Sequence, residues 1–136
     1  MNADEFALSF VNEITKEKDD VKKSFRARAR DLYSMAYSDG IIPMLAYAYS
    51  KAKEKNIMKI LEGIKEIGIK EEDKSYALYA VAIIRYLKEV ENIREIDGKI
   101  DSLINKIKEN EDLLTNKILA FMNWLKLFSE AKIEIE

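Results

Sequence analysis

The fold class follows from the stretch Ser38-Asp39-Gly40-Ile41-Ile42-Pro43-Met44-Leu45-Ala46-Tyr47. Its first three residues form the clearest break in the chain, because they combine polar side chains with a glycine. An amphipathic helix is predicted after the break, since Ile42, Leu45 and Tyr49 recur at spacings of three and four residues. Pro43 falls in the first turn of that helix, where a missing backbone N–H costs nothing. The stretch therefore predicts a polar turn between two helices.

Apolar residues recur at the same spacing along the rest of the chain, and the strict alternation typical of strands is hard to find. The stripes are Phe6, Phe10 and Ile14; Val21, Phe25, Leu32 and Met35; Ile57, Ile60, Leu61 and Ile64; Leu78, Ala82, Ile83, Tyr86 and Val90; Ile100, Leu103, Ile104 and Ile107; and residues 118–128. With 136 residues, the chain is expected to be one domain, 1–136, of the all-α class. Its predicted architecture is a compact bundle of about six or seven helices.

Capping residues and breaks predict where these helices begin and end. Helix starts are expected at Asn2 with Glu5 as a capping box, at Asp19 or Asp20, at Asn56, at Ser75, and after Gly98 and Asn110. The fourth helix is expected to stop at Gly68, and Lys70–Lys74 is expected to be a loop.

Histidine and cysteine are both absent from the chain. Histidine is the usual general acid or base near neutral pH and the commonest transition-metal ligand, and cysteine supplies thiolate nucleophiles and zinc ligands. Their absence excludes Ser-His-Asp and Cys-His catalysis as well as zinc hydrolysis. The four glycines are scattered singly, which excludes a glycine-rich phosphate loop. No enzymatic activity and no cofactor are expected.

The chain has no apolar run long enough to cross a bilayer. Its beginning, Met1-Asn2-Ala3-Asp4-Glu5, lacks the basic region and the apolar core of a signal peptide. A cytoplasmic location without a membrane partner is expected. The formal net charge is −2, so nucleic-acid binding would require a local basic patch.

Basic residues gather in two places that could form such a patch. The candidates are Lys22, Lys23, Arg26, Arg28 and Arg30 on the second predicted helix, and Lys51 and Lys53 after the third. Arg26 and Arg30 lie four residues apart on one helix face, and the planar guanidinium group matches phosphate oxygens. An ordinary solvated surface explains the same pattern, more readily for the lysines than for the arginines.

Carboxylate and aromatic residues offer two weaker signals. Asp97 and Asp101 could place two oxygens on one helix face for Mg²⁺, although a solvated face explains them better. Tyr37 and Tyr47 flank the Ser38–Gly40 turn and could stack on RNA bases, although tyrosines at helical spacing are more often packing residues. Trp124 lies in an apolar helix and is expected to be a core residue.

Two stretches resemble a known family. One is the stretch quoted first, followed by Ser50-Lys51-Ala52, and the other is Lys117-Ile118-Leu119-Ala120-Phe121-Met122-Asn123-Trp124-Leu125-Lys126-Leu127-Phe128. Together they resemble the small helical subunit of the type III-B CRISPR effector, the Cmr complex. Family members carry a proline some residues before the glycine, and residues 30–34 of this chain have none, which suggests a more continuous second helix.

The resemblance implies a non-catalytic subunit in antiviral defence. Such subunits stack in a filament of copies of themselves, beside the backbone subunits of the effector, and help to line the path of the guide RNA and target RNA. The basic candidates are assigned to RNA from the charge pattern alone. Two alternatives stay open: the small subunit of another CRISPR effector, type I-A or III-A, and a carboxylate-dependent metal enzyme that uses Asp97 and Asp101.

Overall fold

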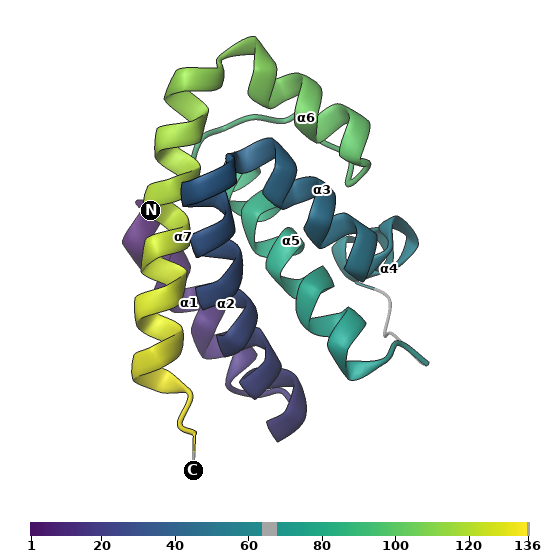
Figure 1. Cartoon of the computed structure of the whole chain (residues 1–136), viewed down its shortest axis with the longest axis vertical. Helices are drawn as coiled ribbons and strands as arrows, with labels where there is room; N and C mark the ends of the chain where they lie inside the picture. Colours follow the sequence, from purple (N-terminus) through teal and green to yellow (C-terminus); the bar gives the residue numbers. More distant parts are fainter. Residues whose placement is uncertain (64–67, 136) are drawn as a thin grey trace.

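The computed structural model of the protein describes residues 1–63 and 68–135, and these fold into seven α-helices without a strand (Figure 1). The helices are α1 (Ala3–Ile14), α2 (Asp19–Asp39), α3 (Ile41–Ala52), α4 (Glu54–Leu61), α5 (Glu71–Glu89), α6 (Ile100–Glu109) and α7 (Glu111–Lys132). The predicted all-α bundle is therefore confirmed. Helix α2 runs without a break from Asp19 to Asp39, in agreement with the absence of a proline in its second half.

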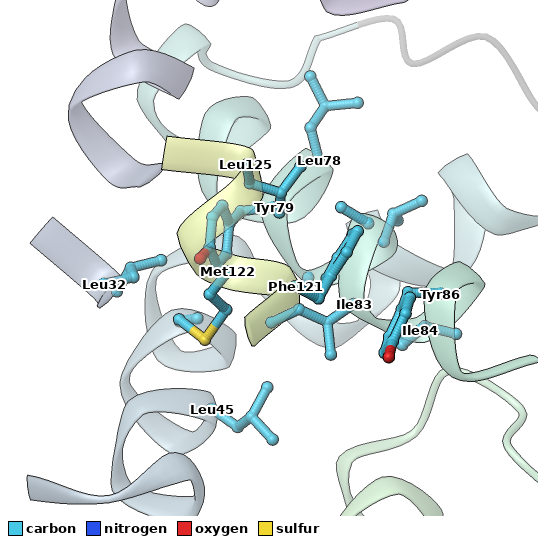
Figure 2. Packing of buried hydrophobic residues seen from close by; sticks show 14 of the residues in the cluster. Leu32, Leu45, Leu78, Tyr79, Ile83, Ile84, Tyr86, Phe121, Met122 and Leu125 are labelled. Atoms are coloured by element: carbon cyan, nitrogen blue, oxygen red, sulfur yellow. The ribbon is translucent and has the colours of Figure 1, made fainter. Parts of the chain in front are cut away.

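Helix α5 lies at the centre of the bundle. Every residue from Ser75 to Ile84 is buried, because α2, α3 and α4 pack against α5 on several sides and α1 and α7 cover its C-terminal half. The tightest aromatic contact joins the stacked rings of Tyr86 and Phe121, whose centroids are 4.3 Å apart (Figure 2). Phe6 of α1 lies 5.9 Å from Phe121 and extends the same cluster to the first helix. The core thus ties the first, fifth and last helices together.

Of the predicted N-terminal caps of the first two helices, one is confirmed and one is not. The Asn2 side chain accepts a hydrogen bond from the Glu5 N–H and the Glu5 carboxylate accepts one from the Asn2 N–H, both at 3.1 Å, so the predicted capping box is confirmed. Neither Asp19 nor Asp20 is a cap, because both already lie in the first turn of α2 behind Lys18. Their carboxylates still stabilise the helix, since negative charge near an N-terminus interacts favourably with the helix dipole.

The boundaries around α4 and α5 also differ from expectation. Helix α4 begins at Glu54, and the buried Asn56 side chain donates a hydrogen bond to the Ala52 carbonyl oxygen, 2.9 Å away. The described part of α4 ends at Leu61, and the predicted Ile64 lies outside the described residues. The prediction that Lys70–Lys74 is a loop was wrong: α5 begins at Glu71, and its three consecutive acidic residues form a first turn favoured by the helix dipole.

The prediction that Trp124 is a core residue was also wrong. Phe121, Met122 and Leu125 fill the inward face of α7, and Trp124 projects from the side of that helix with 37% of its surface exposed. Its indole stacks on Phe128, with ring centroids 5.4 Å apart. No helix among the described residues is long and apolar enough to span a bilayer.

Candidate nucleic-acid interface

The basic residues of α2 divide between two sides of the helix. Lys22, Arg26 and Arg30 follow one another at intervals of four residues, and Lys23 lies beside Lys22 at the outer edge of the same face. We call these four residues the α2 ridge. At its N-terminal end, the ridge borders a hollow of about 270 Å³ between α2 and the end of α7. The hollow is lined by the basic residues Lys22, Lys23 and Lys132, the acidic residues Asp19 and Glu134, and Ile133.

Among the described residues, two of the four α2 ridge side chains pair with a carboxylate and two do not. Lys22 pairs with Asp19 at 3.2 Å, and the exposed Arg30 pairs with its neighbour Asp31 at 3.5 Å. Arg26 and Lys23 make no ion pair or hydrogen bond with any described residue, and the Nε atom of Arg26 is buried without an acceptor. Such exposed ion pairs contribute little to stability, so the ridge can exchange its few partners for phosphate oxygens.

Arg28 is separated from the α2 ridge. Its guanidinium group lies over the ring of Tyr76 on α5, with 4.7 Å between the Cζ atom and the ring centroid. The Arg28 Nη1 atom also donates a hydrogen bond to the Tyr76 hydroxyl, 2.7 Å away. This half-buried side chain therefore holds α2 against α5, which the spacing of the arginines did not predict.

Tyr76 extends the contact of Arg28 to the third helix. The rings of Tyr76 and Tyr47 meet edge to face at 6.0 Å, and the Lys51 ammonium lies 5.5 Å from the centroid of Tyr47. Burial and the Tyr47 hydroxyl raise the pKa of Tyr76, and the charge of Arg28 lowers it by a smaller amount. We call Arg28, Tyr76, Tyr47 and Lys51 the tyrosine cluster. It joins candidates from both predicted basic groups, and Tyr76 is a member that sequence reasoning missed.

Lys53 lies at the junction between α3 and α4. Its backbone has a positive φ of 70°, and its ammonium pairs with Asp73 of α5 at 3.7 Å. A hollow of about 340 Å³ opens beside it, lined by the basic residues Lys53, Lys55, Lys59 and Lys70 together with Asn56 and Asp73. This lysine-lined hollow is separate from the α2 ridge, so the structure does not bring all seven candidates into one site.

Two tyrosines continue the face of the α2 ridge toward the end of the helix. Tyr33 and Tyr37 follow Arg26 and Arg30 at helical spacing, and their ring centroids lie 6.2 Å apart. The Lys126 ammonium of α7 lies 5.8 Å from the centroid of Tyr33. Tyr37 is 75% exposed, and together with Tyr33 and Ser34 it forms an open hollow of about 420 Å³.

The paired carboxylates do not form a metal site. Asp97 lies in the loop before α6 rather than one helical turn from Asp101, and its Oδ1 atom accepts hydrogen bonds from Ser102 Oγ at 2.7 Å and from the Lys99 N–H at 3.0 Å. The bond from Ser102 is the main cause that lowers the pKa of Asp97. No group of three or more Asp or Glu residues in the described ranges is arranged to hold a metal ion. Asp97 therefore closes a loop.

Known proteins resemble this chain along almost its whole length. A family model described as CRISPR-associated protein (Cas_Cmr5) matches residues 2–132. The CRISPR system CMR subunit Cmr5 of Saccharolobus solfataricus is 32% identical over 132 residues, which cover 84% of this chain and 81% of that protein.

Solved structures agree with the sequence matches. A chain in the cryo-EM structure of the type III-B Cmr-beta complex bound to cognate target RNA and AMPPnP superposes with a TM-score of 0.80 and 25% identity. A chain in the same type of complex bound to non-cognate target RNA gives a TM-score of 0.77 and 26% identity. Both alignments cover 98% of this chain and 97% of the other. The chain therefore belongs to the Cas_Cmr5 family and is a small helical subunit of a type III-B Cmr complex.

Proposed function

We propose that this subunit is a non-catalytic, RNA-proximal component of its effector, and that the α2 ridge faces the guide RNA and target RNA in the cytoplasm. The observation that carries this proposal is the guanidinium group of Arg26, which lacks an acidic partner among the described residues and sits in line with Lys22 and Arg30. Arginine on a solvated ridge can contact phosphates without reading sequence. This mode suits a subunit that must accept any target sequence.

The tyrosine cluster and Lys53 extend the basic surface on other sides of the molecule. Lys51 is already held over the ring of Tyr47, and Arg28 is already bound to Tyr76, so these two side chains are positioned before RNA arrives. We assign Lys53, beside the lysine-lined hollow, to further phosphate contacts. The affinity of the free subunit for RNA is expected to be weak and sensitive to salt, because a few phosphate contacts supply only non-specific binding.

An apolar stripe on α7 supports a role in assembly. Leu113, Ala120, Trp124 and Leu127 lie on one face of α7, with Lys117 between Leu113 and Ala120, and Leu113, Trp124 and Leu127 are 48%, 37% and 42% exposed. Aromatic and aliphatic side chains grouped in this way are typical of surfaces that become buried against another protein. We propose that the α7 stripe packs against a neighbouring subunit of the effector, either a backbone subunit or another copy of this chain in a filament.

The side chains available to the subunit support a role without catalysis. The chain has no histidine or cysteine, and burial raises the pKa of Tyr49 and Tyr79 above that of ordinary tyrosine, so these hydroxyls stay protonated. Cleavage of RNA is therefore assigned to other subunits of the complex.

Affinity purification of the tagged subunit from its native cells tests the assembly and RNA roles together. Mass spectrometry should identify other Cmr subunits, and sequencing of the bound RNA should recover guide RNA. Recovery of the subunit without either would contradict the proposal. A tagged Trp124→Lys variant tests the α7 stripe in the same experiment, because it retains the α2 ridge and alters the stripe. It should recover less of the other subunits and less of the guide RNA.

A further inference from the structure

Tyr37 is the most exposed aromatic side chain among the described residues. Its surface is 75% exposed, and its one ring contact is with Tyr33, at a tilted angle of 47° and a centroid distance of 6.2 Å. Tyr33 is half-buried, and the Lys126 ammonium lies 5.8 Å from its ring centroid. Most of this ring is therefore open to a ligand from outside the chain.

The surroundings of Tyr37 are basic and lie along a line. Arg30 precedes Tyr37 by two helical turns, Arg26 precedes it by three, and Lys126 of α7 flanks Tyr33 between them. With a rise of 1.5 Å per residue, the path from Arg26 to Tyr37 extends about 16 Å along the axis of α2. This arrangement joins phosphate-binding groups to an open π-face, which is the combination used by proteins that bind single-stranded nucleic acid.

We propose that Tyr37 is a stacking platform for an unpaired RNA base, and that Arg26 and Arg30 hold the phosphates that precede or follow that base. This inference rests on the proposed RNA-proximal role and adds to it the class of ligand: single-stranded rather than duplex RNA. A base within a duplex is stacked on its neighbours and presents no free face to the ring, so stacking requires an unpaired nucleotide. Tyr33 supports the platform, because its ring contacts that of Tyr37 and is itself approached by the Lys126 ammonium.

The charge around Tyr37 favours RNA over a protein partner. Arg26 and Arg30 share the helix face of Tyr37, and Lys126 contacts Tyr33, so positive groups that can pair with phosphates lie along this face. Asp31 makes an exposed contact of 3.5 Å with Arg30, which a phosphate can replace. By contrast, the α7 stripe has the apolar composition that a protein partner requires.

The test compares two single-stranded oligonucleotides of equal length, oligoadenylate and its abasic analogue, which carry the same phosphates and differ in their bases. Fluorescence anisotropy with the full chain should give tighter binding of oligoadenylate. Tyr37→Ala should weaken that binding by about five- to a hundredfold while leaving the abasic affinity unchanged. Tyr37→Phe should bind as the wild type does, because it keeps the ring, and Tyr37→Leu should behave like Tyr37→Ala. Equal melting temperatures confirm that the variants fold.

Cross-linking tests whether Tyr37 also contacts RNA in the assembled effector. Target RNA carrying 4-thiouridine should form a photo-cross-link to the peptide that contains Tyr37. Three results would overturn the inference. The first is that Tyr37→Ala leaves the affinity for oligoadenylate unchanged, and the second is that it weakens the binding of both oligonucleotides equally. The third is that the Tyr37→Ala subunit fails to enter the effector but still binds oligoadenylate more tightly than the abasic analogue, which would identify Tyr37 as a protein contact. If the double variant Arg26→Glu with Arg30→Glu also leaves the affinity for RNA unchanged, the RNA-proximal role itself is wrong. If only the Tyr37 variants leave the affinity unchanged, the stacking platform is wrong and the RNA-proximal role stands.

Discussion

The hydroxyl of Tyr49 donates a hydrogen bond to the backbone carbonyl oxygen of Gly98, 2.8 Å away. This buried contact ties α3 to the loop that precedes α6, across 49 positions of sequence. Glu54 adds a second tie, because its carboxylate accepts a hydrogen bond from the Ile100 N–H at 3.0 Å. Together the two contacts hold α6 against the bundle at the end opposite the start of the α2 ridge (Figure 1).

Removal of the Tyr49 hydroxyl should destabilise the fold without unfolding it. Tyr49→Phe leaves the Gly98 carbonyl oxygen without its donor, and such changes cost about 1–3 kcal/mol of the free energy of unfolding. Tyr37→Phe is the matched control, because Tyr37 is 75% exposed. Urea unfolding measures both. Equal stabilities of the two variants would show that the Tyr49 hydrogen bond contributes nothing.

Substitution of Gly98 by alanine should destabilise the fold. Its φ is 95°, and a Cβ atom would approach the Leu61 Cδ1 atom to 2.8 Å and the Met58 Cγ atom to 3.3 Å. Gly63→Ala is the control, since Gly63 also has a positive φ, 79°, but nothing within 4 Å of the added atom. Both variants incur backbone strain of about 1–3 kcal/mol, so the additional destabilisation in Gly98→Ala measures packing against α4. Thermal unfolding that ranks Gly63→Ala as the less stable variant would contradict this packing.

Alkaline pH should weaken the fold. Burial raises the pKa of Tyr49, with smaller contributions from Glu54 and Asp97, and burial also raises the pKa of Tyr79 and Tyr86. In the unfolded chain these hydroxyls titrate near pH 10, so the unfolded state loses protons first. Stability is therefore fully present below pH 10 and is lost as the pH rises above it. Urea midpoints between pH 8 and 11 test this, and a midpoint that stayed constant or rose above pH 10 would contradict it.

The α7 stripe should govern assembly more than stability. Trp124→Ala removes a side chain that is 37% exposed, so the isolated subunit should be destabilised by less than the roughly 3–5 kcal/mol expected for a buried tryptophan. Incorporation into the effector should fall in size-exclusion chromatography. Leu8→Ala on α1 is the control, because Leu8 is equally exposed and lies outside the stripe. Equal incorporation of both variants would remove the stripe from the interface.

Local sequence signals predicted the helices. They failed for features that depend on contacts between helices. The capping box at Asn2 and the break at Gly40 depend on neighbouring residues, and both are confirmed. The start of α5 at Glu71 was missed because the five consecutive charged residues Lys70–Lys74 look like a loop, although acidic residues suit the first turn of a helix. Apolar composition placed Trp124 in the core, but its angular position on α7 lies outside the inward face.

The sequence predicted which basic residues are candidates for the interface, but it did not predict how the structure groups them. Periodicity correctly aligned Arg26 with Arg30, since both belong to one helix. It could not reveal that Arg28 binds Tyr76, because the two residues are 48 positions apart and meet through the packing of α2 on α5. For the same reason, periodicity could not predict the ion pair between Lys53 and Asp73.

The affinity of the reconstituted effector for target RNA tests the central proposal most directly. Two effectors are compared with the wild type. In the ridge variant the small subunit carries Arg26→Glu and Arg30→Glu. In the α6 variant, the control, it carries Lys99→Glu and Lys108→Glu, which reverse the same number of charges at positions away from the α2 ridge. The ridge variant should bind more weakly at moderate salt, and its salt dependence should become shallower by about 0.7 in log–log slope for each phosphate that the subunit no longer neutralises. The α6 variant should match the wild type. Identical affinity and slope for all three effectors would contradict the assignment of the α2 ridge to RNA.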